Sequence, residues 1–180
     1  NQKFSWQGHN AWSWSVSFSP DGQTIASSCI DKTVRLWNIE TGNCLHDLKG
    51  HVSGVREITF SSDGEYCASG GFDNVVKIWD VQTGKALNTL RGHTAQVCSI
   101  AFSPDNKYLA SGSADKSLIL WDRGTGEIIR IFNGHTGSIR KIKFKDDGTI
   151  IATVSTKEVK LWDLVSGKCV CTSEGPNQET

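Results

Sequence analysis

The sequence predicts an all-β protein whose four small antiparallel sheets stack side by side as the blades of a propeller. The first observation is the pair Gly-His, which recurs every 42 residues from Gly8-His9 to Gly134-His135. The second is a turn segment at a constant offset after each pair, beginning with Ser19-Pro20-Asp21-Gly22. The third is a tryptophan that closes each unit, at Trp37, Trp79, Trp121 and Trp162. Self-similarity at a fixed period of this size is typical of repeat architectures.

Each unit contains four short apolar runs separated by Gly, Pro and Asp. In the second unit these runs are Val55–Phe60, Tyr66–Ser69, Val75–Trp79 and Ala86–Leu90. Runs this short between turn residues are typical of β-strands. A sheet of four such strands is too small to bury both of its faces alone, so successive units must stack on one another. Radial stacking of the units gives a propeller.

The repeat spacing gives the expected domain organisation. We expect one repeat domain over residues 1–176, with units at about 8–49, 50–91, 92–133 and 134–175, and a short tail at 177–180. The segment Lys3 to Gln7 matches the fourth strand of a preceding blade.

The domain is expected to form an incomplete ring. In a ring of seven blades, the number implied by the family resemblance described below, four blades would span only about 206°, at roughly 51° per blade. The chain could belong to a longer propeller, pair with a second copy, or persist as an open arc. Because an arc exposes a large apolar face, the first two outcomes are favoured.

Composition argues against several classes of partner. Nineteen basic and nineteen acidic residues cancel, so no overall field favours nucleic acid or an anionic membrane. No stretch approaches the roughly 20 apolar residues of a membrane helix. Asn1 to Gln7 lacks the basic start and apolar block of a signal peptide, which favours a cytoplasmic location. We therefore expect no nucleic acid partner and no membrane association.

The six cysteines form no CxxC pair and no regular framework. We expect reduced thiols that behave as small buried apolar groups. Cys169 and Cys171 could instead bind a metal ion, but a spacing of two on a strand is weak evidence for this. No metal site and no cofactor are expected.

The motifs resemble one known family. Gly-His followed by Trp-Asp, at Trp79-Asp80, Trp121-Asp122 and Trp162-Asp163, is similar to the WD40 repeat. The resemblance extends from about Lys3 to Gly175. Repeat one departs from the pattern because Asn38 follows Trp37, a change that keeps a hydrogen-bonding side chain. The resemblance implies propeller blades of four antiparallel strands.

Each of the first three repeats also carries a histidine, a serine and an aspartate, which could suggest a catalytic triad. Catalysis needs one exposed nucleophile, an oxyanion site and a cleft, and repetition in three blades favours a structural role. The resemblance implies hydrogen-bonded tetrads that include the tryptophan: His9, Ser27, Asp31, Trp37; His51, Ser69, Asp73, Trp79; His93, Ser111, Asp115, Trp121; and the incomplete set His135, Thr153, Trp162.

Repeat four breaks the pattern. Its tryptophan follows the preceding one after 41 residues rather than 42, and the segment Val154 to Glu158 has no aligned aspartate. We expect this blade to be the least stable of the four.

The resemblance places partner binding on the face that carries the loop after Gly-His and the turn between the second and third strands. The positions carried over to this face are Trp12, Trp14, Ile30, Arg56, Phe72, Gln96 and Arg140, with Cys98, Ala114 and Ser138 beside them. Trp, Phe and Arg are enriched at binding hot spots, although Trp14 or Phe72 could instead pack on a neighbouring blade. Arg56 and Arg140 could bind a carboxylate or a phosphate.

The first strand of repeat four carries three alternating lysines, Lys141, Lys143 and Lys145. We expect a solvated outer face on a terminal blade, of the kind that caps repeat arrays. The alternative is a basic docking patch.

These observations favour a scaffold or adaptor that binds a partner protein or peptide, with no catalytic residues. An architectural or self-assembling repeat fragment is the alternative. An enzyme or small-molecule binder that uses the central channel is disfavoured, because the sequence has no phosphate loop and only His46 lies outside the Gly-His pairs. Self-association or membership of a longer propeller chain is expected.

Overall fold

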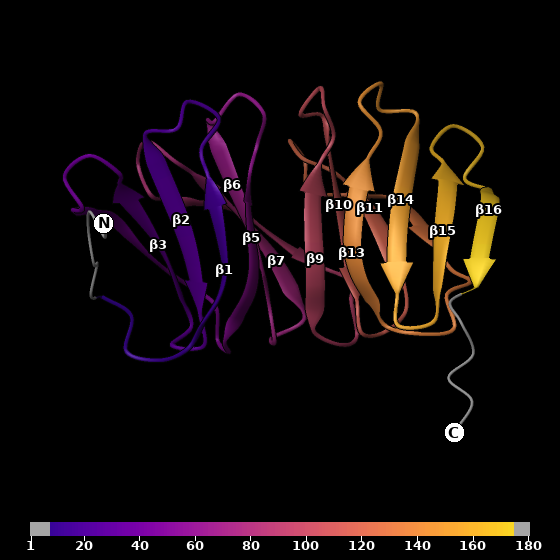
Figure 1. Cartoon of the computed structure of the whole chain (residues 1–180), viewed down its shortest axis with the longest axis horizontal. Coiled ribbons are helices and arrows are strands. Elements are labelled where there is room, and N and C mark those ends of the chain that lie inside the picture. Colours follow the sequence, from indigo (N-terminus) through magenta and orange to yellow (C-terminus); the bar gives the residue numbers. More distant parts are fainter. Residues whose placement is uncertain (1–7, 175–180) are drawn as a thin grey trace, which may run out of the picture.

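The computed structural model describes residues 8–174 and is all-β over that range (Figure 1). The expected segments at Lys3–Gln7 and 177–180 lie outside the described residues. Sixteen strands follow one another along the chain: β1 (Ser13–Phe18), β2 (Thr24–Cys29), β3 (Thr33–Asn38), β4 (Cys44–Lys49), β5 (Val55–Phe60), β6 (Tyr66–Gly71), β7 (Val75–Asp80), β8 (Ala86–Arg91), β9 (Val97–Phe102), β10 (Tyr108–Ser113), β11 (Leu118–Asp122), β12 (Ile128–Phe132), β13 (Ile139–Phe144), β14 (Ile150–Ser155), β15 (Glu158–Asp163) and β16 (Cys169–Glu174).

The strands form four antiparallel sheets of four, each in simple sequence order. We number these blades 1 to 4. The inner strands β1, β5, β9 and β13 contact one another along the concave side, whereas the fourth strand of each blade lies at its outer edge. Each inner strand pairs with its neighbour through a bulge near its start, as between Val55 and Glu57. The expected four-stranded units are thus confirmed, with boundaries within two residues in the second repeat.

Three hydrophobic cores hold the blades together, one between each pair of neighbours. Between blades 1 and 2, Val34 and Leu36 of the first sheet pack against Ile58, Phe60 and other residues of the second. The same positions build the cores between blades 2 and 3 and between blades 3 and 4. The side chains of these cores are buried, and the removal of their apolar area from water stabilises the packing of neighbouring blades.

One glycine shows how closely the blades approach. A Cβ atom placed on Gly70 would lie 2.6 Å from a methyl carbon of Val97 in the next blade. Gly112 holds the corresponding place against Ile139. Any side chain at either position would force neighbouring blades apart, which explains Gly at the end of a strand.

The four sheets form an open arc and do not close into a ring (Figure 1). On the open side of blade 1, Val16 and Phe18 are 62% and 64% exposed, whereas the aligned Ile58 and Phe60 are 2% and 8% exposed. The difference arises because blade 1 covers the aligned residues of blade 2, and no described segment covers blade 1 in the same way. Within residues 8–174 there is no helix long and apolar enough to cross a membrane.

Candidate functional site: hydrogen-bonded tetrads and the loop face

In blades 1 to 3 the histidine, serine, aspartate and tryptophan of each repeat form one hydrogen-bonded chain. In blade 2, His51 Nδ1 lies 2.9 Å from Asp73 Oδ2, and His51 Nε2 lies 2.8 Å from Ser69 Oγ. Trp79 Nε1 donates to the same Ser69 oxygen at 2.8 Å. The corresponding bonds in blades 1 and 3 measure between 2.7 and 3.0 Å.

The directions of these bonds follow from the donors available. An indole nitrogen can only donate, so the serine oxygen accepts from tryptophan, and an ionised carboxylate can only accept, so His Nδ1 carries a proton and donates it to the carboxylate. In the neutral imidazole Nε2 is then an acceptor, and the serine hydroxyl donates its proton to it. The serine hydroxyl is engaged on both sides and buried, so this arrangement leaves no oxygen free to attack a substrate.

Blade 4 has a complete tetrad, so the expectation that its carboxylate is missing was wrong. Glu158 supplies it: Oε1 lies 3.3 Å from His135 Nδ1 and accepts from Thr136 N at 2.7 Å. His135 Nε2 and Trp162 Nε1 both reach Thr153 Oγ1, at 2.6 and 2.8 Å. The turn before β15 is one residue shorter than in the other blades, and the longer glutamate side chain spans the difference.

The carboxylates of the tetrads are held in their charged form. For Glu158, burial opposes ionisation, but hydrogen bonds from Thr136 and the Lys160 ammonium lower its pKa to about 2. Burial likewise opposes ionisation of Asp73 and Asp115, while the hydrogen bonds from His51 and His93 lower the pKa of each carboxyl. Burial and the nearby Lys160 ammonium lower the pKa of His135, although Glu158 opposes the shift.

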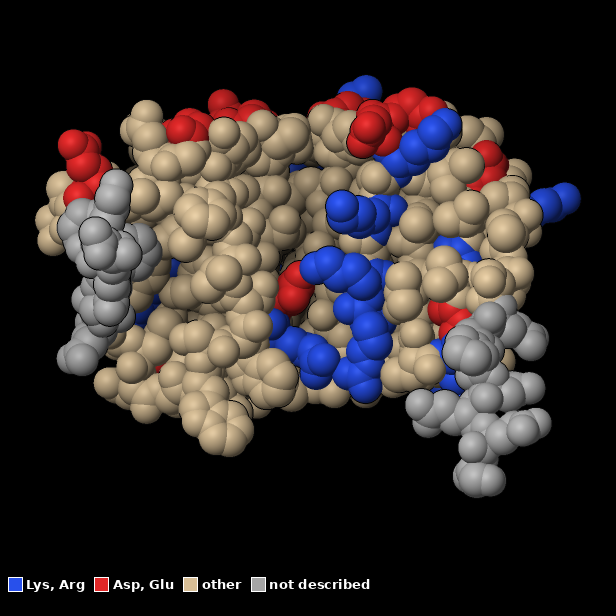
Figure 2. Space-filling model, viewed as in Figure 1, with Lys and Arg blue, Asp and Glu red and all other residues tan. Residues whose placement is uncertain are grey.

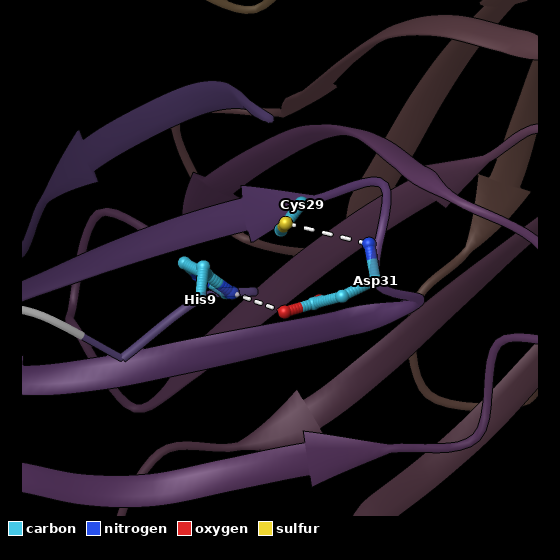
Figure 3. A group of neighbouring side chains, drawn as sticks. All are labelled: His9, Cys29 and Asp31. Atoms are coloured by element: carbon cyan, nitrogen blue, oxygen red, sulfur yellow. Dashed lines mark hydrogen bonds and ion pairs between the residues drawn. The ribbon is translucent and has the colours of Figure 1, made fainter. Parts of the chain in front are cut away.

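His9, Cys29 and Asp31 lie close enough together to hold a metal ion (Figure 3). Both imidazole nitrogens are already engaged, with Asp31 Oδ2 at 3.0 Å and with Ser27 Oγ at 2.7 Å. The Cys29 sulfur accepts from Asp31 N at 3.3 Å and contacts the Ala11 carbonyl oxygen at the same distance. Ser113 makes the same two bonds in blade 3, to Asp115 N and Ala95 O. Cys29 therefore replaces a turn serine, and its geometry is that of a structural bond.

The loops that enter the inner strands and the turns between the second and third strands meet at one end of every blade. We call this end the loop face. Backbone bonds join its two parts, from Ile30 N to Trp12 O, from Phe72 N to Gly54 O, from Ala114 N to Gln96 O and from Thr156 N to Ser138 O. The residues predicted for partner binding thus lie at the same end of the arc.

The predicted loop-face residues differ in how far they reach solvent. Trp12 is 79% exposed, and Trp14, Ile30 and Arg140 are also exposed. Arg56, Phe72, Gln96 and Ala114 are half-buried, and Cys98 is buried. Val52, which directly follows a tetrad histidine, is 78% exposed and was missed from the sequence, although its place in the repeat could have revealed it.

Trp14, Phe72 and Arg56 form a cluster that joins blades 1 and 2. The rings of Trp14 and Phe72 meet edge to face with centroids 5.8 Å apart, and the Arg56 guanidinium lies 5.5 Å from the Trp14 ring centroid. Trp14 therefore packs on the neighbouring blade, as the alternative interpretation expected, while remaining exposed on its other side. Such a preorganised aromatic surface loses little side-chain freedom when it binds a partner.

Lys141 and Lys143 of β13, and Lys145 directly after it, are exposed as expected, but the expectation of an outer face was wrong for Lys141. Its Nζ lies 3.1 Å from Glu57 Oε1 on β5, two blades away. Figure 2 shows Lys and Arg side chains gathered in the middle of the molecule beside acidic atoms. Lys145 instead pairs with Asp147 in its own turn. The inner strands converge at the concave side, which is why a lysine on one blade can reach a glutamate on another.

The cysteines divide into two groups. All six are free thiols; Cys29, Cys67 and Cys98 are buried, whereas Cys44, Cys169 and Cys171 are exposed. The expectation of buried thiols therefore holds for only half of them. His46, the histidine outside the Gly-His pairs, bonds to the Gln82 carbonyl oxygen at 3.1 Å on the surface.

Curated proteins share single stretches of this sequence. WD repeat-containing protein pop2 of Schizosaccharomyces pombe is 44% identical over 50 residues, which cover 28% of this chain and 7% of that protein. A probable E3 ubiquitin ligase complex SCF subunit sconB of Arthroderma benhamiae is 40% identical over 50 residues, covering 28% and 8%. Eukaryotic translation initiation factor 3 subunit I of Aspergillus niger is 44% identical over 41 residues, covering 23% and 12%. The matched stretches thus span about a tenth of these relatives.

The family model described as WD domain, G-beta repeat (WD40) matches residues 1–38, 42–80, 84–122 and 126–163. Each of the last three matches begins before the outer strand of one blade and continues through three strands of the next. The sequence repeat is therefore offset from the structural blade. Matching stretches cover most of the sequence, and the chain belongs to the WD40 repeat family.

Proposed function

We propose that this chain is a protein-interaction scaffold whose loop face holds a partner protein or peptide. The observation that carries the proposal is the exposure of large apolar side chains on that face. Trp12, Trp14, Ile30 and Val52 all reach solvent there, next to the half-buried Phe72. An apolar surface of this kind on a rigid scaffold is typical of binding sites.

The geometry supports a binding role over a catalytic one. The serine hydroxyls of the tetrads are buried and bonded on both sides, and a glutamate replaces the aspartate in blade 4 without loss of the network. A structural network tolerates such a change, whereas catalysis demands one fixed geometry. The names of two relatives, an SCF complex subunit and an initiation factor subunit, describe members of protein assemblies and support the same proposal.

Truncation of the most exposed tryptophan tests the proposal. Immobilised wild-type chain, Trp12→Ala and Trp14→Ala are compared for the proteins they capture from a cell lysate. The matched control is Val165→Ala, an equally exposed apolar residue in the turn between β15 and β16. We expect the control to capture the wild-type set and both tryptophan variants to lose it. Retention of the full set by both tryptophan variants would exclude the loop face.

Self-assembly is the second candidate, supported by the open face of blade 1. A cavity of about 750 Å³ on that face is lined by residues that include His9, Val16, Ile25 and Trp37. A further blade, from a second copy or a longer chain, would bury these residues in the same way as blades 1 to 3 cover the aligned residues of blades 2 to 4. Light scattering tests it: a dimer that Val16→Glu converts to a monomer supports it, and a wild-type monomer opposes pairing of two copies.

We propose a cytoplasmic location as part of the same function. All six cysteines are free in the structure, which fits a reducing compartment. Imaging of the tagged chain in its source cells tests this, with diffuse cytoplasmic signal expected.

A further inference from the structure

The exposed charges of the loop face have one sign. Lys32 and Lys116 follow the tetrad aspartates of blades 1 and 3, and Lys157 precedes Glu158 in blade 4. All three lysines are exposed and, within residues 8–174, their side chains form no ion pair or hydrogen bond. The opposite end of the arc carries an exposed aspartate in each blade, at Asp21, Asp63, Asp105 and Asp147. In Figure 2 most acidic side chains lie along the upper edge, together with some basic ones, and most basic side chains lie in the middle of the view.

The acidic residues of the loop segments do not balance these lysines. The carboxylates there belong to the tetrads, and each accepts bonds from an imidazole and from a backbone amide. The side chains of Asp73 and Asp115 are 4% and 10% exposed. The aspartate charges are therefore engaged by hydrogen bonds inside the blade. The exposed lysines give the surface of the loop face a net positive potential, which attracts a partner of opposite charge.

Two arginines add to this surface at the mouth of the concave side. Arg56 and Arg140 hold the same bulge position at the start of β5 and β13, each directly before a residue of the Lys141–Glu57 ion pair. That ion pair brings the two inner strands within side-chain reach of each other. Among the described residues, neither guanidinium forms an ion pair with a carboxylate. The Arg56 guanidinium makes a cation–π contact with the Trp14 ring.

The basic and apolar groups are continuous. Arg56 belongs both to the arginine pair and to the aromatic cluster with Trp14 and Phe72. Ile30 lies against the same cluster, since its side chain and that of Phe72 both border Gly54. A ligand that fits must therefore present carboxylates next to a large apolar side chain.

We propose that the loop face binds an acidic polypeptide segment that carries an aromatic or large apolar residue. The apolar residue packs on Trp14, Phe72 and Ile30, and the flanking carboxylates bind Arg56 and Arg140, with the exposed lysines increasing the rate of association. This inference rests on the proposed scaffold function and specifies the chemistry of its partner.

A polypeptide fits this surface better than a nucleic acid does. Nucleic acid binding uses a continuous basic track along the phosphate backbone, and the net charge of the whole chain is zero. Here the cations surround an apolar cluster. Nucleic acid binding is therefore an outcome that the experiment must distinguish.

The test uses the full chain and a fluorescein-labelled random copolymer of glutamate and tyrosine, followed by fluorescence anisotropy. Poly-glutamate without tyrosine and a single-stranded oligothymidine of equal charge are the comparison probes. The double variant Arg56→Gln/Arg140→Gln is compared with Arg56→Lys/Arg140→Lys and with Lys85→Gln/Lys168→Gln. The last pair removes two exposed lysines from the turns at the opposite end. Thermal melting verifies that all variants fold.

We expect the glutamate–tyrosine copolymer to bind more tightly than either comparison probe. The Arg→Gln double variant should bind it about tenfold more weakly, equivalent to ~1.4 kcal/mol. The Arg→Lys variant should retain most of the affinity, and the Lys85/Lys168 variant all of it.

Three results would overturn the inference: no binding of the copolymer, equal losses in the Arg→Gln and Lys85/Lys168 variants, or tighter binding of the oligothymidine. The proposed scaffold function fails separately, by the capture experiment with Trp12→Ala. If Trp12→Ala loses its captured proteins while Arg56→Gln/Arg140→Gln retains them and binds the copolymer normally, the scaffold function stands and the acidic partner does not.

Discussion

Replacement of Glu158 by alanine should destabilise blade 4 more than any other change to an acidic residue there. The carboxylate accepts from Thr136 N at 2.7 Å, from Thr136 Oγ1 at 3.1 Å and from His135 Nδ1 at 3.3 Å, and Oε2 lies 3.2 Å from Lys160 Nζ. The His135 side chain is fully buried and that of Lys160 is 12% exposed. Alanine would remove this acceptor from His135 Nδ1 and from both Thr136 donors, whereas Lys160 Nζ would keep its bond to Thr172 Oγ1.

The expected loss follows from the burial of the pair. Removing one partner of a buried ion pair costs about 3–5 kcal/mol, because the other charge remains uncompensated. Lys160 retains some access to solvent, so we expect the lower end, about 3 kcal/mol. For a chain of this size each kcal/mol shifts the Tm by about 2–4 °C, which gives a decrease of about 6–12 °C. Glu158→Asp should fall between, since the shorter side chain no longer spans the shortened turn.

Calorimetry and hydrogen exchange measure this effect at two levels. The Tm reports the whole chain, and exchange of the β14 and β15 amides reports blade 4 separately from blades 2 and 3. Glu127→Ala is the matched control, because Glu127 lies exposed in the turn between β11 and β12. A Glu158→Ala protein that melts with the control and keeps slow exchange in β14 would refute the assignment of Glu158 to the tetrad.

Three further predictions concern the same networks and the thiols. His93→Ala should lower the free energy of unfolding by about 1–3 kcal/mol, because it leaves buried polar groups unpaired, and unchanged melting would contradict this. Since the pKa of folded Glu158 is about 2, against 4.5 for the unpaired side chain, its stabilisation should be complete above pH 4.5 and decline as the pH falls toward 2. Urea titrations at pH 7, 4 and 2.5 measure this decline, which should be shallower in Glu158→Ala. Brief alkylation of the native protein at pH 8, followed by mass spectrometry, should modify the exposed thiols of Cys44, Cys169 and Cys171. It should spare Cys29, Cys67 and Cys98, because all three are buried and burial also raises the pKa of the Cys67 thiol. Equal labelling of all six cysteines would contradict the packing.

The blades could be predicted from the sequence because each repeat encodes the same local rules four times. Turn residues at fixed offsets place the strands, and the alternation of apolar residues places the cores between blades. The tetrads of blades 1 to 3 were expected from the resemblance of each repeat to the WD40 family. Glu158 was missed because the prediction looked for an aspartate at a fixed distance after each histidine. In blade 4 a glutamate one position later supplies the carboxylate at the same place in the network. A one-residue deletion beside a longer acidic side chain was the available signal.

Other features depend on packing between repeats and lay beyond a repeat-by-repeat interpretation. The pairing of Lys141 with Glu57 depends on the curvature of the arc, which brings non-adjacent inner strands together. The exposure of Cys44 and Cys169 arises because they begin outer strands, where neighbouring blades give little cover. The contact of Arg56 with Trp14 likewise joins two blades whose sequences were interpreted separately.

The imidazole tautomers and the exchange rates of the ring protons test most directly the central structural claim, that each repeat is closed by an imidazole bridge between a carboxylate and a buried hydroxyl. Long-range ¹H–¹⁵N NMR correlations of the ring nitrogens distinguish a proton on Nδ1 from one on Nε2. The account predicts the Nδ1–H form for His9, His51, His93 and His135, with slowly exchanging ring protons. Rings that carry the proton on Nε2, or that exchange it as fast as the surface residue His46, would contradict it.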